Sequence, residues 1–196
     1  MTRSSQQSVQ PTYADRAFRS GPGLAGGVLV LAIAVWFGVD AIVRGHGATP
    51  WLALSALLFV VPLVFAFTLR PAVFVGAERL RVRNPFRTIT LPWASVKDVR
   101  AAYSSEVFTQ EGAKYQLWAI PVSLRQRKGA LRRGTTEPGE ARLGPSDQAI
   151  AEVREMVRVH ADNPAAQGEP VIRWAYELIA PMAVGAVLLT ILAIIG

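Results

Sequence analysis

Cysteine is absent from this chain of 196 residues, and histidine occurs only as His46 and His160. The lack of cysteine excludes disulfides, thiolate zinc sites and cysteine nucleophiles. Two histidines so far apart in the chain argue against a histidine metal site or a proton relay. We therefore expect neither a metal nor another cofactor.

The motifs of common enzymes are also missing. There is no Gly-x-Ser-x-Gly elbow, no phosphate loop and no pair of metal ligands. Glu106 and Glu111 are close in sequence, but they flank a turn, where a solvated position is the default. The run Gly21-x-Gly23-x-x-Gly26 matches a dinucleotide-binding fingerprint by letter, yet a polar tail precedes it and an apolar run follows. We interpret these glycines as a flexible entry to a membrane helix and expect that the chain is not an enzyme.

Charge is scarce, and what there is has an excess of one sign. Only 18% of the residues are charged and 51% are apolar, whereas roughly a quarter are charged in a typical soluble domain. The formal net charge of +7 makes acidic lipid headgroups and nucleic acid candidate partners. No helix carries a basic face, because Arg154 and Arg158 are balanced by Glu152 and Glu155. We therefore expect no nucleic-acid partner.

Three long apolar runs predict three transmembrane helices. Twenty helical residues cover about 30 Å, the thickness of the hydrocarbon core of a bilayer. The first run exceeds the apolar core of a cleaved signal peptide, and a second run follows at once, so we interpret it as an anchor. The short connection 44–50 forces the first two helices into an antiparallel hairpin, and Pro62 and Pro181 predict kinks. The predicted spans are 24–43, 51–69 and 175–196, with Arg173 and Trp174 placed at the head of the third.

Two acidic residues fall within or beside these spans, and each has two interpretations. Asp40 is either a functional carboxylate or the partner of Arg44, which lies one helical turn further on. Glu177 is either functional or a headgroup-level residue next to Arg173. We expect local pairing for Asp40 and a headgroup-level position for Glu177.

The basic residues predict the orientation of the chain. Only Arg44 lies in the loop between the first two spans, whereas Arg16 and Arg19, Arg70 and Arg173 flank the opposite ends of the spans. The positive-inside rule then places the tail and the segment between spans two and three in the cytoplasm, and the C-terminus outside. We expect a multi-pass protein of the cell membrane.

Residues 1–23 are polar and predict a disordered tail, and residues 70–161 predict a small domain. Leu80 and Val82 alternate with arginines, as Ile89 and Leu91 do with threonines, which predicts strands with one apolar face. Asn84-Pro85 predicts the turn between them, and Trp93 follows in a helical turn. Further strands are expected at 97–103, 106–109 and 114–122.

A basic loop at 125–145 and an amphipathic helix at 146–161 complete the domain. Ile150, Val153, Met156 and Val157 predict the buried stripe of the helix, with Ser146 as its N-cap. Residues 162–172 read as a linker. The fold class is therefore α+β: three membrane helices with an inserted small antiparallel β domain, capped by a C-terminal helix.

Two motifs of the domain carry a resemblance to a known family. Val75-Gly-Ala-Glu-Arg-Leu-Arg-Val-Arg-Asn-Pro-Phe-Arg87 and Leu91-Pro-Trp-Ala-Ser-Val-Lys-Asp-Val99 resemble the bacterial pleckstrin-homology (PH)-like domains of actinobacterial membrane proteins. These include the group named after the low-molecular-weight protein antigen 6. The resemblance implies a PH superfold attached to membrane helices. Relatives in eukaryotes bind phosphoinositides through a long basic loop between the first two strands, and here that link is only Gly76-Ala77-Glu78.

These observations favour a membrane protein that presents a cytoplasmic PH-like domain to anionic inner-leaflet lipid or to a protein partner. The alternative is an auxiliary subunit of a transporter or another membrane complex, in which the helices contact another membrane protein or a second copy. For contact with an anionic surface we name first the five basic residues of the loop. The residues are Arg125, Arg127, Lys128, Arg132 and Arg133. We rank Arg79, Arg81 and Arg83 second, because a solvated outer strand face explains them equally well.

Overall fold

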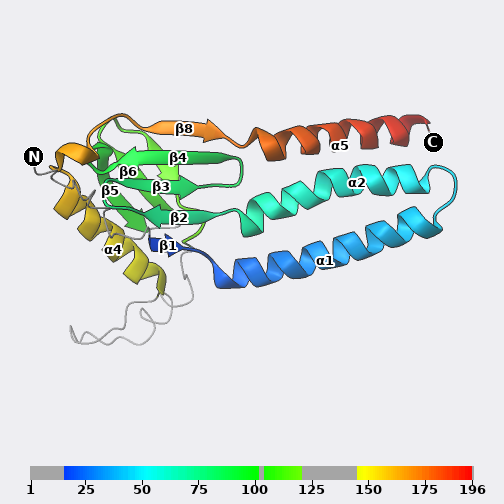
Figure 1. Cartoon of the computed structure of the whole chain (residues 1–196), viewed down its shortest axis with the longest axis horizontal. Coiled ribbons are helices and arrows are strands. Elements are labelled where there is room, and N and C mark those ends of the chain that lie inside the picture. Colours follow the sequence, from blue (N-terminus) through cyan, green and yellow to red (C-terminus); the bar gives the residue numbers. More distant parts are fainter. Residues whose placement is uncertain (1–15, 102–103, 121–144, 196) are drawn as a thin grey trace, which may run out of the picture.

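The structure is a computed structural model of the chain, and it describes residues 16–101, 104–120 and 145–195. A group of three apolar helices lies at one end and a small β domain at the other (Figure 1). The helices are α1 (Gly21–Arg44), α2 (Thr49–Val64), which is continued by the π-helical turn η1 (Phe65–Leu69), and α5 (Tyr176–Ile195). All three are long and apolar enough to cross a membrane. The predicted spans are confirmed as helices, with ends shifted by a few residues.

Helix α2 lies between α1 and α5 and contacts both (Figure 1). Glycines allow these contacts to be close. A Cβ at Gly185 of α5 would lie 2.7 Å from the backbone nitrogen of Phe59, and one at Gly38 of α1 would lie 2.6 Å from the side chain of Leu57. The packing of α2 against α5 therefore depends on a missing side chain at Gly185.

The β domain contains two antiparallel sheets. The larger has the strand order β1-β2-β3-β4-β8, and the smaller has the order β5-β6-β7. The strands of the larger sheet are β1 (Arg16–Phe18), β2 (Ala72–Val75), β3 (Arg79–Arg83), β4 (Arg87–Pro92) and β8 (Val171–Trp174). The smaller sheet consists of β5 (Val96–Ala101), β6 (Ser105–Thr109) and β7 (Lys114–Gln116). The 3-10 turn η2 (Trp93–Ser95) joins β4 to β5.

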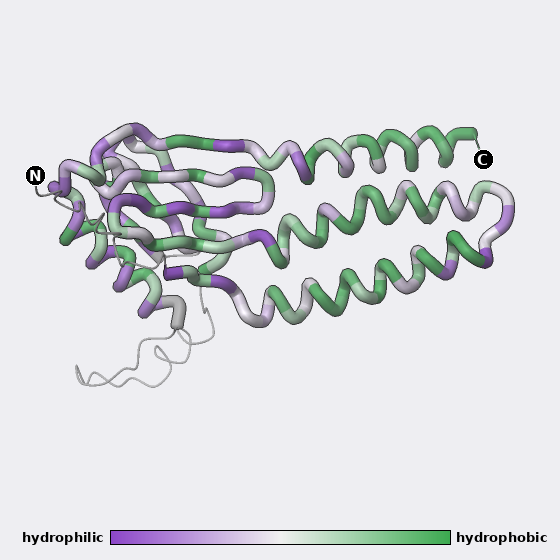
Figure 2. The backbone as a smooth tube through the Cα atoms, in the orientation of Figure 1, coloured by the Kyte–Doolittle hydropathy of each residue, from purple (hydrophilic) through white to green (hydrophobic). Residues whose placement is uncertain are grey.

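The hydrophobic core fills the space between the two sheets. The apolar residues of β2, β3 and β4 point inward, and Figure 2 shows the resulting alternation of hydrophobic and hydrophilic positions along these strands. Trp93 is fully buried in this core, and its indole Nε1–H donates to the carbonyl oxygen of Gly76 at 3.1 Å. Burial of a tryptophan of this kind stabilises a small domain by several kcal/mol, on the order of 3–5.

Helix α4 (Pro145–His160) closes one side of the core, beside β5 (Figure 1). Ile150, Val153 and Met156 are buried in the core cluster and Val157 packs against it, so the predicted stripe is confirmed. The helix begins at Pro145, one residue before the predicted start. The 3-10 turn η3 (Pro164–Ala166) follows it.

Three predictions about chain segments are wrong. Residues 16–18 belong to β1, which pairs with β2, and residues 21–23 are helical, so the tail is not disordered as far as residue 23. Residues 171–174 form β8, which pairs with β4 and is therefore neither a linker nor the head of a membrane helix. The strand predicted at 114–122 ends at Gln116. Leu117 still donates its N–H to the carbonyl oxygen of Ser105, and the chain then turns, with the Ile120 N–H donating to the Leu117 carbonyl oxygen.

Each membrane helix continues almost directly into a strand of the larger sheet. Arg19 and Ser20 separate β1 from α1, Arg70 and Pro71 separate the end of α2 from β2, and Ala175 alone separates β8 from α5. The β3–β4 hairpin also contacts the helices, because Phe86 packs edge-to-face on Phe67 with ring centroids 5.4 Å apart. The strands of this sheet run in nearly the same direction as the helices (Figure 1).

Candidate functional site

The outer face of the larger sheet carries arginines in register with threonines. The alternation that sends Leu80 and Val82 into the core places Arg79, Arg81 and Arg83 on the opposite face. Pairing between strands then brings together residues that are distant in sequence. Arg83 pairs with Thr88, which pairs with Arg173, and Arg81 pairs with Thr90, which pairs with Val171.

These two rows and the first turn of α5 line a hollow of about 610 Å³. Its size is within the range of sites that hold a small ligand, which is about 300–1,000 Å³. The hollow lies where the sheet meets the helices, because Arg70 follows α2 and Glu177 lies in the first turn of α5. Its lining consists of Arg70, Arg79, Arg81, Arg83, Thr88, Thr90, Val171, Arg173, Trp174 and Glu177.

Arg70 connects the helices to the sheet at the floor of the hollow. Its guanidinium donates to the carbonyl oxygen of Asn84 at 3.3 Å, to the Thr88 hydroxyl at 3.4 Å and to the Glu177 carboxylate at 3.0 Å. The Arg70 side chain is only 13% exposed, whereas that of Glu177 is 63% exposed. The ion-pair partner of Glu177 is thus Arg70, which is distant in sequence, rather than its sequence neighbour Arg173.

Asn84 holds the hairpin that carries the lower row of the hollow. It is buried, donates from its side chain to the carbonyl oxygen of Gln116 at 2.8 Å, and closes the turn through its backbone N–H to Arg87. The turn predicted at Asn84-Pro85 is thus confirmed. The link between β2 and β3 is also as short as the sequence implied, with three residues between Val75 and Arg79.

Positive charge dominates the hollow, since five arginines line it against the single carboxylate of Glu177. Burial lowers the pKa of Arg83 from its ordinary value, and the neighbouring charges of Arg70, Arg19 and Arg81 lower it further. The Arg83 guanidinium also lies over the ring of Phe74, 5.1 Å from its centroid. Arg83 remains charged at neutral pH, and its lowered pKa records burial first and repulsion by the neighbouring cations second.

Few of these cations have a partner among the described residues. Arg79 pairs with Glu78 at 2.7 Å, and Arg70 pairs with Glu177. Within residues 16–101, 104–120 and 145–195, Arg81, Arg83 and Arg173 form no ion pair. A cluster of arginines with this excess of positive charge is suited to bind an anion, because each guanidinium can donate two parallel hydrogen bonds to a phosphate.

The five basic residues of the loop, from Arg125 to Arg133, lie outside the described residues, so their role stays a prediction. The structure brings the second set, Arg79, Arg81 and Arg83, together with Arg70 and Arg173. Sequence reasoning treated Arg70 and Arg173 only as markers of topology. A signal for their role existed, since both lie beside membrane spans, but the pairing of β8 with β4 could not be read from the sequence.

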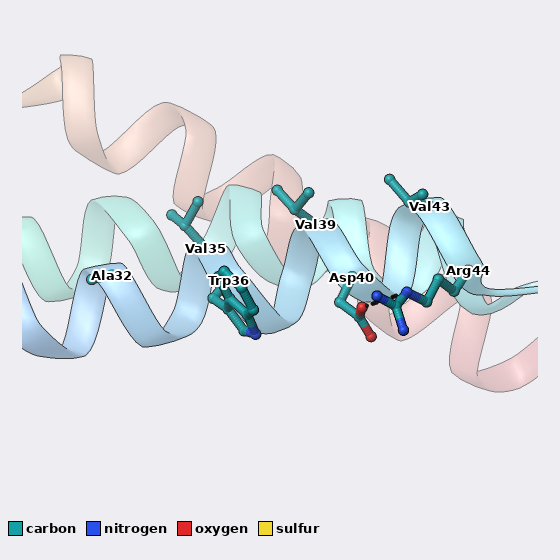
Figure 3. A pocket seen from close by; sticks show the side chains of 7 residues that line it. All are labelled: Ala32, Val35, Trp36, Val39, Asp40, Val43 and Arg44. Carbon is teal, nitrogen blue, oxygen red and sulfur yellow. Dashed lines mark ion pairs between the residues drawn. The ribbon is translucent and has the colours of Figure 1, made fainter.

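A second groove lies along α1, on the lipid-facing surface near the end distant from the sheet (Figure 3). It is mostly apolar and contains the predicted pair between Asp40 and Arg44, whose Oδ1 and Nε atoms are 2.9 Å apart. This pairing is therefore confirmed. All residues that line the groove come from one face of one helix, as expected for a surface covered by lipid.

Metal ligands do not gather in the described part of the chain, where no group of three or more histidine, aspartate or glutamate residues is placed to hold an ion. The described hollow thus offers arginine and threonine donors for an anion rather than ligands for a cation.

Two antiparallel sheets packed around one core, closed by a helix that follows the strands and joined to apolar helices, define a membrane-associated protein with a PH-like domain. A family model described as Bacterial PH domain matches residues 70–186, which is more than half of the chain. The chain therefore belongs to the bacterial PH domain family, as its sequence motifs indicated. The match begins after α2 and includes β8 and the first half of α5, so all residues that line the hollow lie within the matched region. No curated protein and no solved structure gave a match.

Proposed function

We propose that this protein is a membrane-anchored binding module whose PH-like domain holds the headgroups of anionic lipids at the membrane boundary. The observation that supports it is the hollow, in which Arg83 and Arg173 flank Thr88 beside the first turn of α5. A hollow lined by arginines and threonines also favours a binding role over a catalytic one.

The position of the hollow fits a lipid ligand. Arg83 lies next to the hairpin turn that contacts Phe67 of the membrane-spanning segment, and Arg173 lies three residues before α5 begins. Both guanidinium groups are thus near the depth at which lipid phosphates lie. Each Lys or Arg near an anionic membrane surface contributes about 1 kcal/mol, so the two together contribute about 2 kcal/mol, or about 30-fold in affinity.

The proposal includes an orientation. With the β domain in the cytoplasm, the hollow lies at the level of the inner leaflet, which is the anionic one, and Arg44, the last residue of α1, is the single Lys or Arg at the opposite ends of α1 and α2. The basic loop residues from Arg125 to Arg133, which lie outside the described residues, would add a second contact with an anionic surface. The helices already anchor the chain, so these charges orient the domain and select its lipids rather than recruit it.

The test uses the full chain in nanodiscs of phosphatidylcholine with graded amounts of phosphatidylglycerol. Native mass spectrometry then counts the phosphatidylglycerol molecules that stay bound after release from the nanodisc. The R83Q/R173Q variant is expected to need about 30-fold more phosphatidylglycerol for the same retention. The control is R100Q, since Arg100 is an exposed arginine of the smaller sheet, paired with Asp98.

A third variant replaces the five basic residues of the loop by glutamine and separates the loop from the hollow. Retention of one tightly held lipid should survive this change. Equal retention by the wild type and by R83Q/R173Q contradicts the proposal.

A further inference from the structure

We infer that the hollow binds a lipid headgroup with two phosphate groups at different distances from the membrane, in preference to a headgroup with a single phosphodiester. A lipid diphosphate is the simplest example of such a ligand. This inference rests on the proposed function and names the ligand class of the same site. The observations that carry it are the two rows of donors and the distribution of charge between them.

The donors of the hollow lie in two tiers. The lower tier consists of Arg70, Arg83, Thr88 and Arg173, and the upper tier of Arg81 and Thr90, with Arg79 beyond it. Residues two apart on an antiparallel strand are separated by about 6.8 Å, so this is the distance between the tiers along β3. Because the strands run nearly parallel to the helices, the upper tier lies further from the membrane than the lower one (Figure 1).

The lower tier is already partly neutralised by the chain itself. Glu177 pairs with Arg70, which leaves Arg83 and Arg173 to face one anion across the Thr88 hydroxyl. One phosphodiester, with a single negative charge, matches this tier. It cannot also reach Arg81, since its phosphate stays at the depth of the membrane surface.

A lipid with a single phosphodiester leaves the positive charge of Arg81 in the upper tier without a counter-ion. Arg81 forms no ion pair within the described residues, whereas Arg79 is paired with Glu78. Arg83 and Arg81 are two residues apart on the same face of β3, and the charge of Arg81 adds to the effect of burial in lowering the pKa of Arg83, so an anion bound between the two arginines offsets their repulsion. A terminal phosphomonoester adds a charge of about −1.5 to −2 and three acceptor oxygens, which suits Arg81 and the Thr90 hydroxyl.

The space is also sufficient. A hollow of about 610 Å³ is larger than one phosphate needs, and its lining above the lower tier remains polar, with Thr90 between Arg81 and Val171. The lipid chain then leaves toward the membrane past α5, and the second phosphoryl group points away from the membrane along β3.

The experiment again uses the full chain in phosphatidylcholine nanodiscs, with one probe lipid at a time. The probes are phosphatidylglycerol, a polyprenyl monophosphate and the polyprenyl diphosphate of the same chain length, and retention is counted by native mass spectrometry. Soluble inorganic pyrophosphate is added in a separate arm as a competitor. We expect the diphosphate to be retained about tenfold better than the monophosphate, the ordinary effect of one additional hydrogen-bonded charge.

Variants of each tier test the assignment. R81Q should remove the advantage of the diphosphate and leave retention of the monophosphate unchanged, whereas R173Q should weaken both. R81K keeps the charge but loses the paired donors, so it should recover part of the advantage and show that the strand still folds. R100Q serves as the control.

The two proposals fail in different ways. If phosphatidylglycerol depends on Arg83 and Arg173 but the diphosphate gains nothing, or keeps its gain in R81Q, the two-tier assignment is overturned and the proposed function stands. If no lipid depends on these arginines, both are overturned. If soluble pyrophosphate displaces the lipid diphosphate at equal concentration, the diphosphate chemistry is supported and its source is a soluble compound rather than a lipid.

Discussion

Replacement of Arg70 by methionine should loosen the joint between the membrane helices and the sheet. The change removes three hydrogen bonds at once, to the Asn84 carbonyl, the Thr88 hydroxyl and the Glu177 carboxylate. The methionine keeps an apolar stem of similar length, so lost packing contributes little. The neighbouring hairpin then keeps its backbone bonds, the Asn84–Gln116 hydrogen bond and the contact of Phe86 with Phe67, but loses its tie to Arg70.

The size of the effect follows from the geometry. Hydrogen bonds from a charged donor contribute about 1.5–3 kcal/mol, and the two long ones to Asn84 and Thr88 together belong near the low end of that range. The pair with Glu177 contributes about 0.5–1 kcal/mol, because the Glu177 side chain is 63% exposed. Arg70→Met should therefore lower the free energy of local unfolding at the joint by about 2–3 kcal/mol. Glu177→Gln should lower it only by the contribution of the ion pair, about 0.5–1 kcal/mol.

Hydrogen exchange of the full chain in nanodiscs measures this cost at two reporter amides. Asn84 donates its N–H to the Arg87 carbonyl at 2.9 Å, and Ala175 donates to Phe86 at 2.8 Å. Since about 1.4 kcal/mol corresponds to a tenfold change, exchange at both amides should rise about 30- to 150-fold in R70M and about two- to fivefold in E177Q. The double variant gives the coupling energy between the two side chains, expected at about 0.5–1 kcal/mol.

R100M is the matched control, because Arg100 is an arginine paired with a carboxylate on the smaller sheet, away from the joint. It should leave exchange at Asn84 and Ala175 unchanged. The reasoning is refuted if R70M exchanges like the wild type at these amides, or if E177Q has as large an effect as R70M.

Two further predictions concern the helices and the smaller sheet. Gly185→Ala should weaken the packing of α5 on α2 by about 1–3 kcal/mol, because the new Cβ would meet the backbone of Leu58 and Phe59. The control is Gly26→Ala in α1, whose Cβ would meet nothing within 4 Å and which should be neutral or stabilising. Unfolding in mixed micelles compares the two variants, and equal stabilities would contradict the packing. Asp98→Asn should destabilise the domain by at most about 1 kcal/mol at pH 7, since the hydrogen bond from Arg100 lowers the pKa of the Asp98 carboxyl and the group is partly exposed. This contribution is fully present above the unfolded pKa of 3.8 and is lost as the pH falls through the lower folded value, so the wild type and the variant should converge in thermal unfolding at strongly acid pH; a difference that persists there would sink the assignment.

Much of the fold could be predicted from the sequence because its signals are local. The alternation at 79–83 and 88–91, the turn at Asn84, and the stripe of Ile150, Val153 and Met156 each lie within a few residues of one another. The three apolar runs are recognisable from length and composition alone. These elements were placed correctly to within a few residues.

The edges of the larger sheet could not be predicted in this way. β1 has three residues and β8 has four, and neither alternates, because an edge strand takes its shape from the partner it pairs with. Their partners, β2 and β4, lie more than fifty and more than seventy residues away along the chain. The hollow depends on that pairing, since Arg173 joins Arg83 only through the register of β8 on β4.

The three short junctions between helices and strands have a mechanical consequence. Three separate attachments, through Arg19-Ser20, Arg70-Pro71 and Ala175, remove the freedom of the sheet to pivot or spin above the bilayer. A domain attached by a single linker could rotate freely about the membrane normal. This domain, attached at three points, presents the same side to its neighbours in the plane of the membrane. A change in bilayer thickness that tilts one helix must then either shear the sheet or tilt all three helices together. The angle of the sheet relative to the bilayer therefore follows the tilt of the three helices.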